Sequence, residues 1–159
     1  MLRVGTVGTS SIMRTIQEAI RLTDGMECRV VYSRTGEQGR AFAAEMGVPE
    51  HCTDYAAMLE RSDLDLIDIA SPNCFHAEQA LAALEHGKHV IVEKPAAVTR
   101  GDVQRLIDAA RANGVYFFEA ITTLFMPQYE ACRLLLPKLG RIEQAHITYA
   151  QYSSRYDAY

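Results

Sequence analysis

The chain has 159 residues, of which 48% are hydrophobic and 23% are charged, and its formal net charge is −4. This length supports one domain with a sizeable core. The mild negative charge offers no basic surface for nucleic acid, and no apolar run approaches the roughly 18 residues that span a bilayer. We therefore expect neither nucleic acid nor a membrane as a partner.

Strand-like sequence begins at the second residue, so we expect no secretory signal and a cytoplasmic location. The cysteines show no CxxC spacing and are interpreted as reduced thiols, with no metal site and no disulfide framework. They are Cys28, Cys52, Cys74 and Cys132. Four of the five histidines are interpreted as surface or core residues without a chemical role: His51, His86, His89 and His146.

Strand and helix patterns alternate along the chain. Strands are predicted over 2–7, 27–32, around 52, over 64–70, 88–92 and 115–118, with helices that begin near residues 11, 35, 54, 76, 100 and 127. The helix near residue 35 has the pattern of a capping box over 35–38. The tail 141–153 alternates like a seventh strand, with no later strand to pair with. This order is typical of an α/β protein with a doubly wound parallel sheet.

The turn after the first strand, Gly8-Thr9-Ser10-Ser11-Ile12, matches the dinucleotide fingerprint G-x-G-x-x-G/A only in part. Gly8 holds the first position, while Ser10 and Met13 replace the other two glycines, and Met13 predicts slightly looser packing of the helix on the sheet. Backbone N–H groups at such a helix start bind pyrophosphate. A simple helix N-cap explains the two serines as well, and both interpretations stay open.

The second strand ends in Ser33-Arg34-Thr35. Domains that bind NAD usually place Asp or Glu at this point, on the ribose 2′-hydroxyl. An arginine flanked by hydroxyl groups instead suits a 2′-phosphate, because guanidinium binds phosphate in a bidentate manner. The sequence therefore favours NADP over NAD, with a solvated loop arginine as the alternative.

The strand 88–92 leads into Glu93-Lys94-Pro95. Proline lacks the N–H that continues a ladder, so the strand stops there and releases a lysine at its carboxyl end, where parallel sheets bind ligands. A lysine ammonium in this position can stabilise a developing alkoxide or relay a proton. Glu93 either orients Lys94 or is a polar strand-end residue, and Lys94 alone could be an ordinary surface lysine.

With these motifs in order, and with Ser71-Pro72-Asn73 and His76 between them, the chain resembles the Gfo/Idh/MocA family of glucose–fructose oxidoreductase-like and inositol dehydrogenase-like enzymes. The resemblance implies a Rossmann-type domain that binds NADP or NAD. It also implies that Lys94 lies beside the nicotinamide and the reacting substrate carbon. The segment from Ser71 to His76 would line the cofactor channel, although His76 on sequence alone is more typical of a helix first turn.

The run Glu119-Ala120, followed by Pro127-Gln128, resembles the dihydrodiol dehydrogenase-like branch of the family. That branch often has an arginine and a histidine between these pairs, where this chain has Leu124 and Met126. Substrate contacts are therefore not carried over from it. A sugar, a polyol or a dihydrodiol is compatible with the motifs.

Family members are about twice this long, and their second half forms the substrate pocket and often an oligomer interface. We therefore expect a dinucleotide-binding domain over 1–126 and, over 127–159, a linker helix with the first strand of a second α+β domain. The predicted protein is a homo-oligomeric oxidoreductase whose 159 residues are incomplete for catalysis. A non-catalytic, nucleotide-binding regulatory or redox-sensing module is the alternative.

Overall fold

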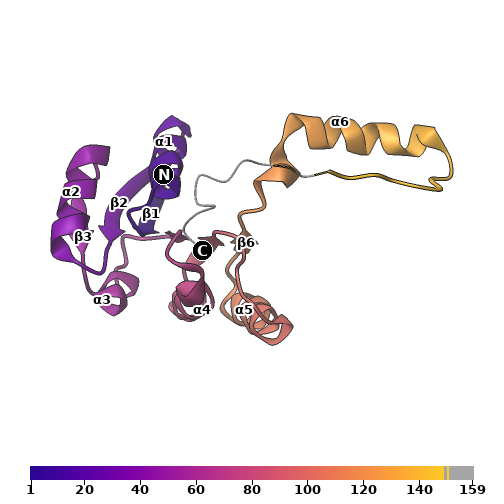
Figure 1. Ribbon diagram of the computed structural model, residues 1–159. Helices are drawn as coiled ribbons and strands as arrows, with labels where there is room; N and C mark the ends of the chain where they lie inside the picture. Colours follow the sequence, from indigo (N-terminus) through magenta and orange to yellow (C-terminus); the bar gives the residue numbers. More distant parts are fainter. Residues whose placement is uncertain (149, 151–159) are drawn as a thin grey trace. The chain divides into compact units, whose positions relative to one another are not determined.

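The structure is a computed structural model that describes residues 1–148 and 150 (Figure 1). The chain forms two compact units, Met1–Ile121 and Thr122–Tyr159, which are described separately. The domain boundary predicted between residues 126 and 127 falls inside the second unit.

The first unit is built on one parallel sheet. Its strands are β1 (Leu2–Val7), β2 (Met26–Tyr32), β3 (Glu50–Cys52), β4 (Leu66–Ile69), β5 (His89–Val92) and β6 (Phe117–Glu119). Their order is β3-β2-β1-β4-β5-β6, and every neighbouring pair is parallel. The order reverses between β1 and β4, which is the switch point of a Rossmann-type doubly wound sheet. The predicted fold class is confirmed.

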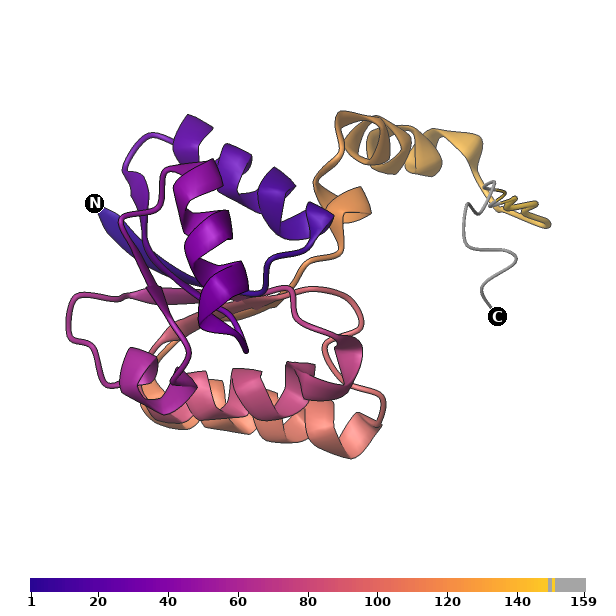
Figure 2. The same cartoon turned by 60° about the vertical axis from the view of Figure 1, so that its left-hand side comes forward.

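Helices cover both faces of this sheet (Figure 2). They are α1 (Ser11–Leu22), α2 (Gly36–Met46), α3 (Tyr55–Leu59), α4 (His76–Glu85) and α5 (Arg100–Asn113), with a 3₁₀ turn η1 (Asn73–Phe75) before α4. The helices α1 and α2 lie on one face, and α3, α4 and α5 lie on the other. Alternate residues along each strand point to opposite faces, so each face has its own apolar core.

The larger core lies beneath α3, α4 and α5 and includes Ile67, Ile69, Leu84 and Leu106, none of which is more than 1% exposed. The cores beneath α1 and α2 are smaller and contain Met13, among others. Burial of an aliphatic side chain contributes about 1.5–3 kcal/mol. These cores hold the strands in register and so fix where each strand ends.

Three helices of the first unit, α1, α3 and α5, are capped by a side chain at the N-terminus. Ser10, Asp54 and Thr99 accept hydrogen bonds from the backbone N–H groups of the first turns of α1, α3 and α5. The capping box predicted over 35–38 is wrong, because Thr35 makes no side-chain cap hydrogen bond. Its backbone carbonyl accepts from Gly39 N–H, at 3.1 Å, and the start of α2 is set by this bond.

The second unit begins with η2 (Thr122–Phe125), α6 (Pro127–Leu135) and η3 (Leu136–Leu139). Pro127 occupies the first turn of α6, where its missing N–H has no intrahelical partner to lose. Residues 141–148 do not form the predicted strand, and positions 149 and 151–153 of it lie outside the described residues. A strand requires a hydrogen-bonded neighbour, and no neighbour is present for 141–148 within the part of the chain described here.

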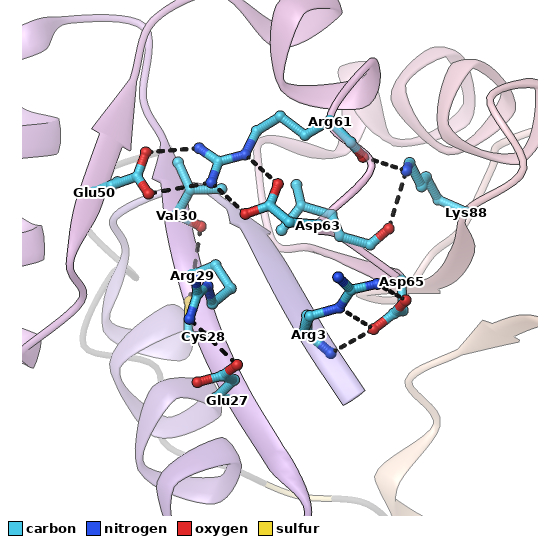
Figure 3. A network of polar contacts seen from close by, with 11 residues as sticks. Arg3, Glu27, Cys28, Arg29, Val30, Glu50, Arg61, Asp63, Asp65 and Lys88 are labelled. Atoms are coloured by element: carbon cyan, nitrogen blue, oxygen red, sulfur yellow. Dashed lines mark hydrogen bonds and ion pairs between the residues drawn. The ribbon is translucent and has the colours of Figure 1, made fainter. Parts of the chain in front are cut away.

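The amino edge of the sheet is held by a network of charged side chains (Figure 3). Arg61 forms ion pairs with Glu50 and Asp63, both at 2.7 Å, and its guanidinium lowers the pKa of Asp63 to about 2. Lys88 is 8% exposed and donates through Nζ to the backbone carbonyls of Arg61 and Leu64, at 2.6 and 2.9 Å. The charged groups of this edge therefore have partners within the protein.

Candidate functional site

The predicted site residues follow four different strands of the sheet. Residues 8–12 follow β1, residues 33–35 follow β2, residues 71–76 follow β4, and residues 93 and 94 follow β5. The strands are parallel, so their carboxyl ends share one edge, opposite the ion-pair network. The topology thus brings all four predicted segments to the edge where doubly wound sheets bind ligands.

Gly8 has φ +114°, a backbone conformation that residues with a Cβ rarely adopt. A Cβ added to Gly8 would lie 2.7 Å from the carbonyl oxygen of Ala70, just beyond β4. Gly8 N–H donates to the carbonyl of Tyr32 at the end of β2, at 3.0 Å. Glycine is required here by the close approach of the chain after β1 to the chain after β4.

Ser10 is the N-cap of α1, and its hydroxyl accepts from Met13 N–H at 3.4 Å. The N-cap interpretation of this serine is therefore confirmed. It is compatible with phosphate binding, because the first N–H groups of a helix, here those of Ser11 and Ile12, have no partner within the helix. The first turn of α1 has no acidic residue to repel an anion.

Met13 stands where the fingerprint has its third glycine. Its side chain is 0% exposed and packs in one cluster with Val31, Phe42 and Ala70. The looser packing predicted from this substitution is not found. The thioether instead fills the space between α1 and the sheet, as flexible methionines do in irregular cores.

The three residues of the turn after β2 differ in how exposed they are. Ser33 is 5% exposed, and its N–H donates to the carbonyl of Cys52 at 3.1 Å. Arg34 and Thr35 are exposed, and Arg34 takes part in none of the ion pairs found within residues 1–148 and 150. Arg34 is thus exposed at the carboxyl edge, in the turn after β2, which is the strand next to β1.

The segment after β4 is linked to α4 and to the turn after β5. The Ser71 hydroxyl donates to Gln79 Oε1 at 2.6 Å. His76, the first residue of α4, is 1% exposed, and its ring nitrogens lie 2.8 Å from two backbone carbonyl oxygens, those of Ser71 and Pro95. The structure therefore places His76 inside the protein as a bridge between two loops of the site. Pro72, on the loop, and Asn73, at the start of η1, are exposed.

Lys94 is presented by a short turn after β5, and its side chain is exposed. Glu93 accepts from the backbone N–H of Lys94 at 3.3 Å, so its described contact with Lys94 is to the backbone. Glu119, the last residue of β6, accepts from Ala96 N–H at 2.9 Å. Glu119 was not among the site residues predicted from the sequence. Its position at a strand end, next to the predicted site edge, was the available signal.

Asp68 lies within β4 and is 6% exposed, and its Oδ1 atom has no hydrogen-bond partner among the residues the structure describes. It pairs in register with Thr6 of β1, whose hydroxyl accepts from Gln17 at 2.9 Å. Burial, with a smaller contribution from the Glu93 carboxylate, raises the pKa of Asp68 to about 7. The sequence signal for this group was an aspartate between Ile67 and Ile69 inside a predicted strand, and it was not singled out from the sequence.

Comparison with known proteins agrees with this geometry. The model of the Gfo/Idh/MocA family, described as an oxidoreductase family with an NAD-binding Rossmann fold, matches residues 2–121. The chain belongs to this family. The match covers the whole of the parallel sheet, including every predicted site segment, so the Gfo/Idh/MocA resemblance seen in the motifs is confirmed.

Relatives within the Gfo/Idh/MocA family are oxidoreductases. The chain is 37% identical over 159 residues to the scyllo-inositol 2-dehydrogenase (NADP(+)) of Bacillus subtilis (strain 168), covering 100% of this chain and 48% of the relative. It is 39% identical over 116 residues to the 1,5-anhydro-D-fructose reductase of Ensifer adhaerens, covering 72% of this chain and 34% of the relative.

Among solved structures of the same fold, a 3-ketoreductase from Actinomadura kijaniata in complex with NADP and TDP-benzene is 31% identical, with a TM-score of 0.81. The similarity covers 86% of this chain and 42% of the ketoreductase. The chain therefore spans about half the length of the family members that it matches.

None of the helices in the described part of the chain has both the length and the hydropathy of a bilayer-spanning segment. Residues 1–148 and 150 contain no group of three or more His, Cys, Asp or Glu side chains arranged to hold a metal ion. The four cysteines are free thiols.

Proposed function

We propose that the protein is an NADP-dependent oxidoreductase that transfers a hydride between the nicotinamide and a hydroxyl-bearing carbon of a sugar, polyol or diol. The observation that carries the proposal is the convergence of the Gly8 turn, Arg34 and Lys94 on the carboxyl edge of one sheet. The matched relatives are named as enzymes, so the regulatory-module alternative is not favoured. Homo-oligomer formation and a cytoplasmic location stay predictions.

The residues at the carboxyl edge fit a dinucleotide. The turn after β1 leads into a helix start whose first N–H groups are directed toward the edge and whose first turn carries no acidic side chain. Thr9, Ser10, Ser11 and Ile12 are the residues we assign to the pyrophosphate. Pro72 and Asn73, exposed after β4, would line the channel toward Lys94.

NADP is favoured because the turn after β2 carries a cation and no acid. The exposed Arg34 is free to bind a 2′-phosphate, with Thr35 beside it as a hydroxyl donor. Ser33 contributes by its burial, which fixes the backbone of the turn. Two of the relatives support this choice by name or by bound cofactor, namely the Bacillus subtilis enzyme and the Actinomadura kijaniata ketoreductase.

Lys94 is the residue to which we assign the acid–base chemistry. The nicotinamide, when bound, supplies or accepts the hydride. The Lys94 ammonium stabilises the negative charge that develops on the substrate oxygen and relays its proton. The turn after β5 keeps the amine at the surface of the carboxyl edge, where it has access to a substrate.

The proposed sugar or polyol class rests on the named substrates of the relatives, an inositol and an anhydro-fructose. Both are polyhydroxylated rings in which a hydroxyl and a carbonyl interconvert. A diol stays in the proposed substrate class because it carries the same reacting group, a hydroxyl-bearing carbon.

Replacement of Lys94 tests the proposed chemistry. In the complete enzyme, we expect Lys94→Ala to lower turnover by about 10²–10⁴-fold, the usual contribution of a general acid–base group. The affinity for NADPH, measured by fluorescence titration, should change by only a few-fold. Lys138→Ala, at an exposed lysine of η3, is the matched control. Near-normal turnover of Lys94→Ala would show that this lysine has no chemical role.

Replacement of Arg34 tests the cofactor preference. Charge-assisted hydrogen bonds contribute about 1.5–3 kcal/mol, so Arg34→Ala should weaken NADPH binding by about 10- to 100-fold and leave NADH binding nearly unchanged. Calorimetry with both cofactors measures this difference. The control is Arg111→Ala, at an exposed arginine in the last turn of α5. Equal dissociation constants of the unaltered protein for the two cofactors would contradict the assignment.

A further inference from the structure

The turn that presents Lys94 has no repeating backbone hydrogen bonds of its own, because it lies between the end of β5 and the start of α5. Side chains hold it instead, one from the adjacent Glu93 and two from distant positions. Within three consecutive residues, the N–H of Lys94, the carbonyl of Pro95 and the N–H of Ala96 are each bound by a side chain. Ala96 is itself 2% exposed and packs in the larger core.

One of these contacts comes from β6. Val92 of β5 and Glu119 of β6 are partners in the parallel register, so the Glu119 carboxylate emerges next to the point where β5 ends. Its Oε1 atom accepts from Ala96 N–H at 2.9 Å. A hydrogen bond to a carboxylate is shorter and stronger than one between neutral groups, so this contact is a firm anchor for the turn.

The second contact comes from α4. The two ring nitrogens of His76 each lie 2.8 Å from a carbonyl oxygen, that of Pro95 and that of Ser71. Carbonyl oxygens only accept, so a ring that carries both protons donates to both, and a neutral ring donates to one. His76 therefore donates to the Pro95 carbonyl when Nδ1 carries a proton, and its ring lies between the turn after β5 and the loop after β4.

By contrast, no hydrogen bond or ion pair to another side chain within residues 1–148 and 150 holds the Lys94 amine in place. Its location is therefore set by its backbone. A shift of about 1 Å in the backbone of a group that acts on a substrate lowers a rate by up to about 10²-fold. The contacts that fix this backbone are thus contacts on which the reaction depends.

We infer that Glu119 and His76 are positioning residues for Lys94, and that they act through the backbone of residues 94–96 without touching the substrate. The inference rests on the proposed function of Lys94 as the acid–base group. Glu119 secures the Ala96 end of the turn, and His76 secures Pro95. Together they make the lysine part of the rigid sheet edge.

The first test measures the backbone protection of the turn directly and does not depend on catalytic activity. Amide hydrogen exchange of the ¹⁵N-labelled chain is followed by NMR in the unaltered protein, in Glu119→Ala and in Glu119→Gln. We expect Ala96 N–H to exchange on the order of tenfold faster or more in Glu119→Ala, because its acceptor is lost. Glu119→Gln keeps an acceptor oxygen at the same place and should restore part of the protection.

The amide of Ala120 provides the internal reference, because it donates to the Val92 carbonyl at 2.8 Å and reports whether β5 and β6 remain paired. It should keep its protection in both variants. Unchanged exchange of Ala96 N–H in Glu119→Ala would overturn the inference. Should Glu119→Ala fail to fold, His76→Asn takes its place, with the same two amides as readout and the same expected direction.

The second test separates this inference from the proposed function. In the complete enzyme, Glu119→Ala should lower kcat by about 10- to 100-fold while the KM for NADPH changes by less than about threefold, with partial recovery in Glu119→Gln. Glu85→Ala, at the exposed end of α4, is the control. A normal kcat in Glu119→Ala beside a collapsed kcat in Lys94→Ala would refute the positioning role alone. A normal kcat in Lys94→Ala would refute the proposed function.

Discussion

The buried carboxyl of Asp68 should make the stability of this protein depend on pH in an unusual direction. In an unfolded chain its pKa is 3.8, whereas burial and the Glu93 carboxylate raise it to about 7 in the fold. Below pH 3.8 the group is neutral in both states and does not penalise folding. As the pH rises toward 7, the unfolded chain loses this proton while the folded protein keeps it, so the fold loses stability relative to the unfolded chain.

The size of this effect follows from the shift. Each unit of pKa difference corresponds to about 1.4 kcal/mol, so a pKa near 7 corresponds to a loss of at most about 4 kcal/mol between pH 4 and pH 8. Asp68→Asn removes the titration and keeps the shape of the side chain. The stability difference between the variant and the unaltered protein should therefore move in favour of the variant by up to about 4 kcal/mol over this range.

Urea unfolding at pH 4, 6 and 8 measures this difference. Any offset due to the hydrogen bonding of the asparagine amide is the same at every pH, and the other titrating groups contribute equally to both proteins, so both cancel in the pH dependence. Glu93→Gln should make the stability difference between Asp68→Asn and its parent depend less on pH. It removes the neighbouring negative charge and so lowers the pKa of Asp68 in the folded protein. A stability difference that does not change with pH would refute the assignment of a raised pKa to Asp68.

Two further predictions concern the structure of the two sheet edges. Gly8→Ala should destabilise the fold by more than about 2 kcal/mol in thermal or urea unfolding, because its Cβ would lie 2.7 Å from the Ala70 carbonyl oxygen at φ +114°. Gly25→Ala, at φ +82° with no atom within 4 Å of its added Cβ, should cost only the backbone strain, and equal losses at the two positions would argue against the close contact. Lys88→Met should cost about 2–4 kcal/mol, because a part-buried and a buried carbonyl oxygen lose a charged donor, while Lys138→Met at the surface should change stability by less than about 0.5 kcal/mol. Similar values for the two lysines would show that the buried contacts of Lys88 contribute little.

Much of the fold was predictable because its signals are local. Alternating apolar strands and helices, with glycine after α2 and α5, predicted every strand of the sheet within a few residues. The parallel topology then followed from the alternation itself, since parallel strands require crossover connections. The predicted strand over 141–153 is not formed in its described part, 141–148 and 150, because the period of two in a sequence does not supply a pairing partner.

The geometry of the candidate site was predictable only in part, because it depends on contacts between distant positions. Lys94 and the Gly8 turn were identified from their place at strand ends. By contrast, His76 bridges carbonyls 5 and 19 positions away, and Glu119 reaches an amide 23 positions away. No local motif encodes such contacts, so sequence analysis assigned His76 to a channel lining or a helix start and left Glu119 without a role.

The charged residues at the two edges of the sheet differ in their contacts. At the amino edge, Arg61 and Lys88 are satisfied by carboxylates and carbonyls, so these charges are committed to holding the fold together. At the carboxyl edge, Arg34 and Lys94 are exposed cations without ion pairs in the described residues, on turns that the protein itself holds firmly. An exposed cation contributes little to stability but is available to an anionic or polar ligand. The rigid turns and the exposed cations without ion pairs are the features on which the proposed binding of a phosphorylated cofactor and the proposed action on a substrate hydroxyl rest.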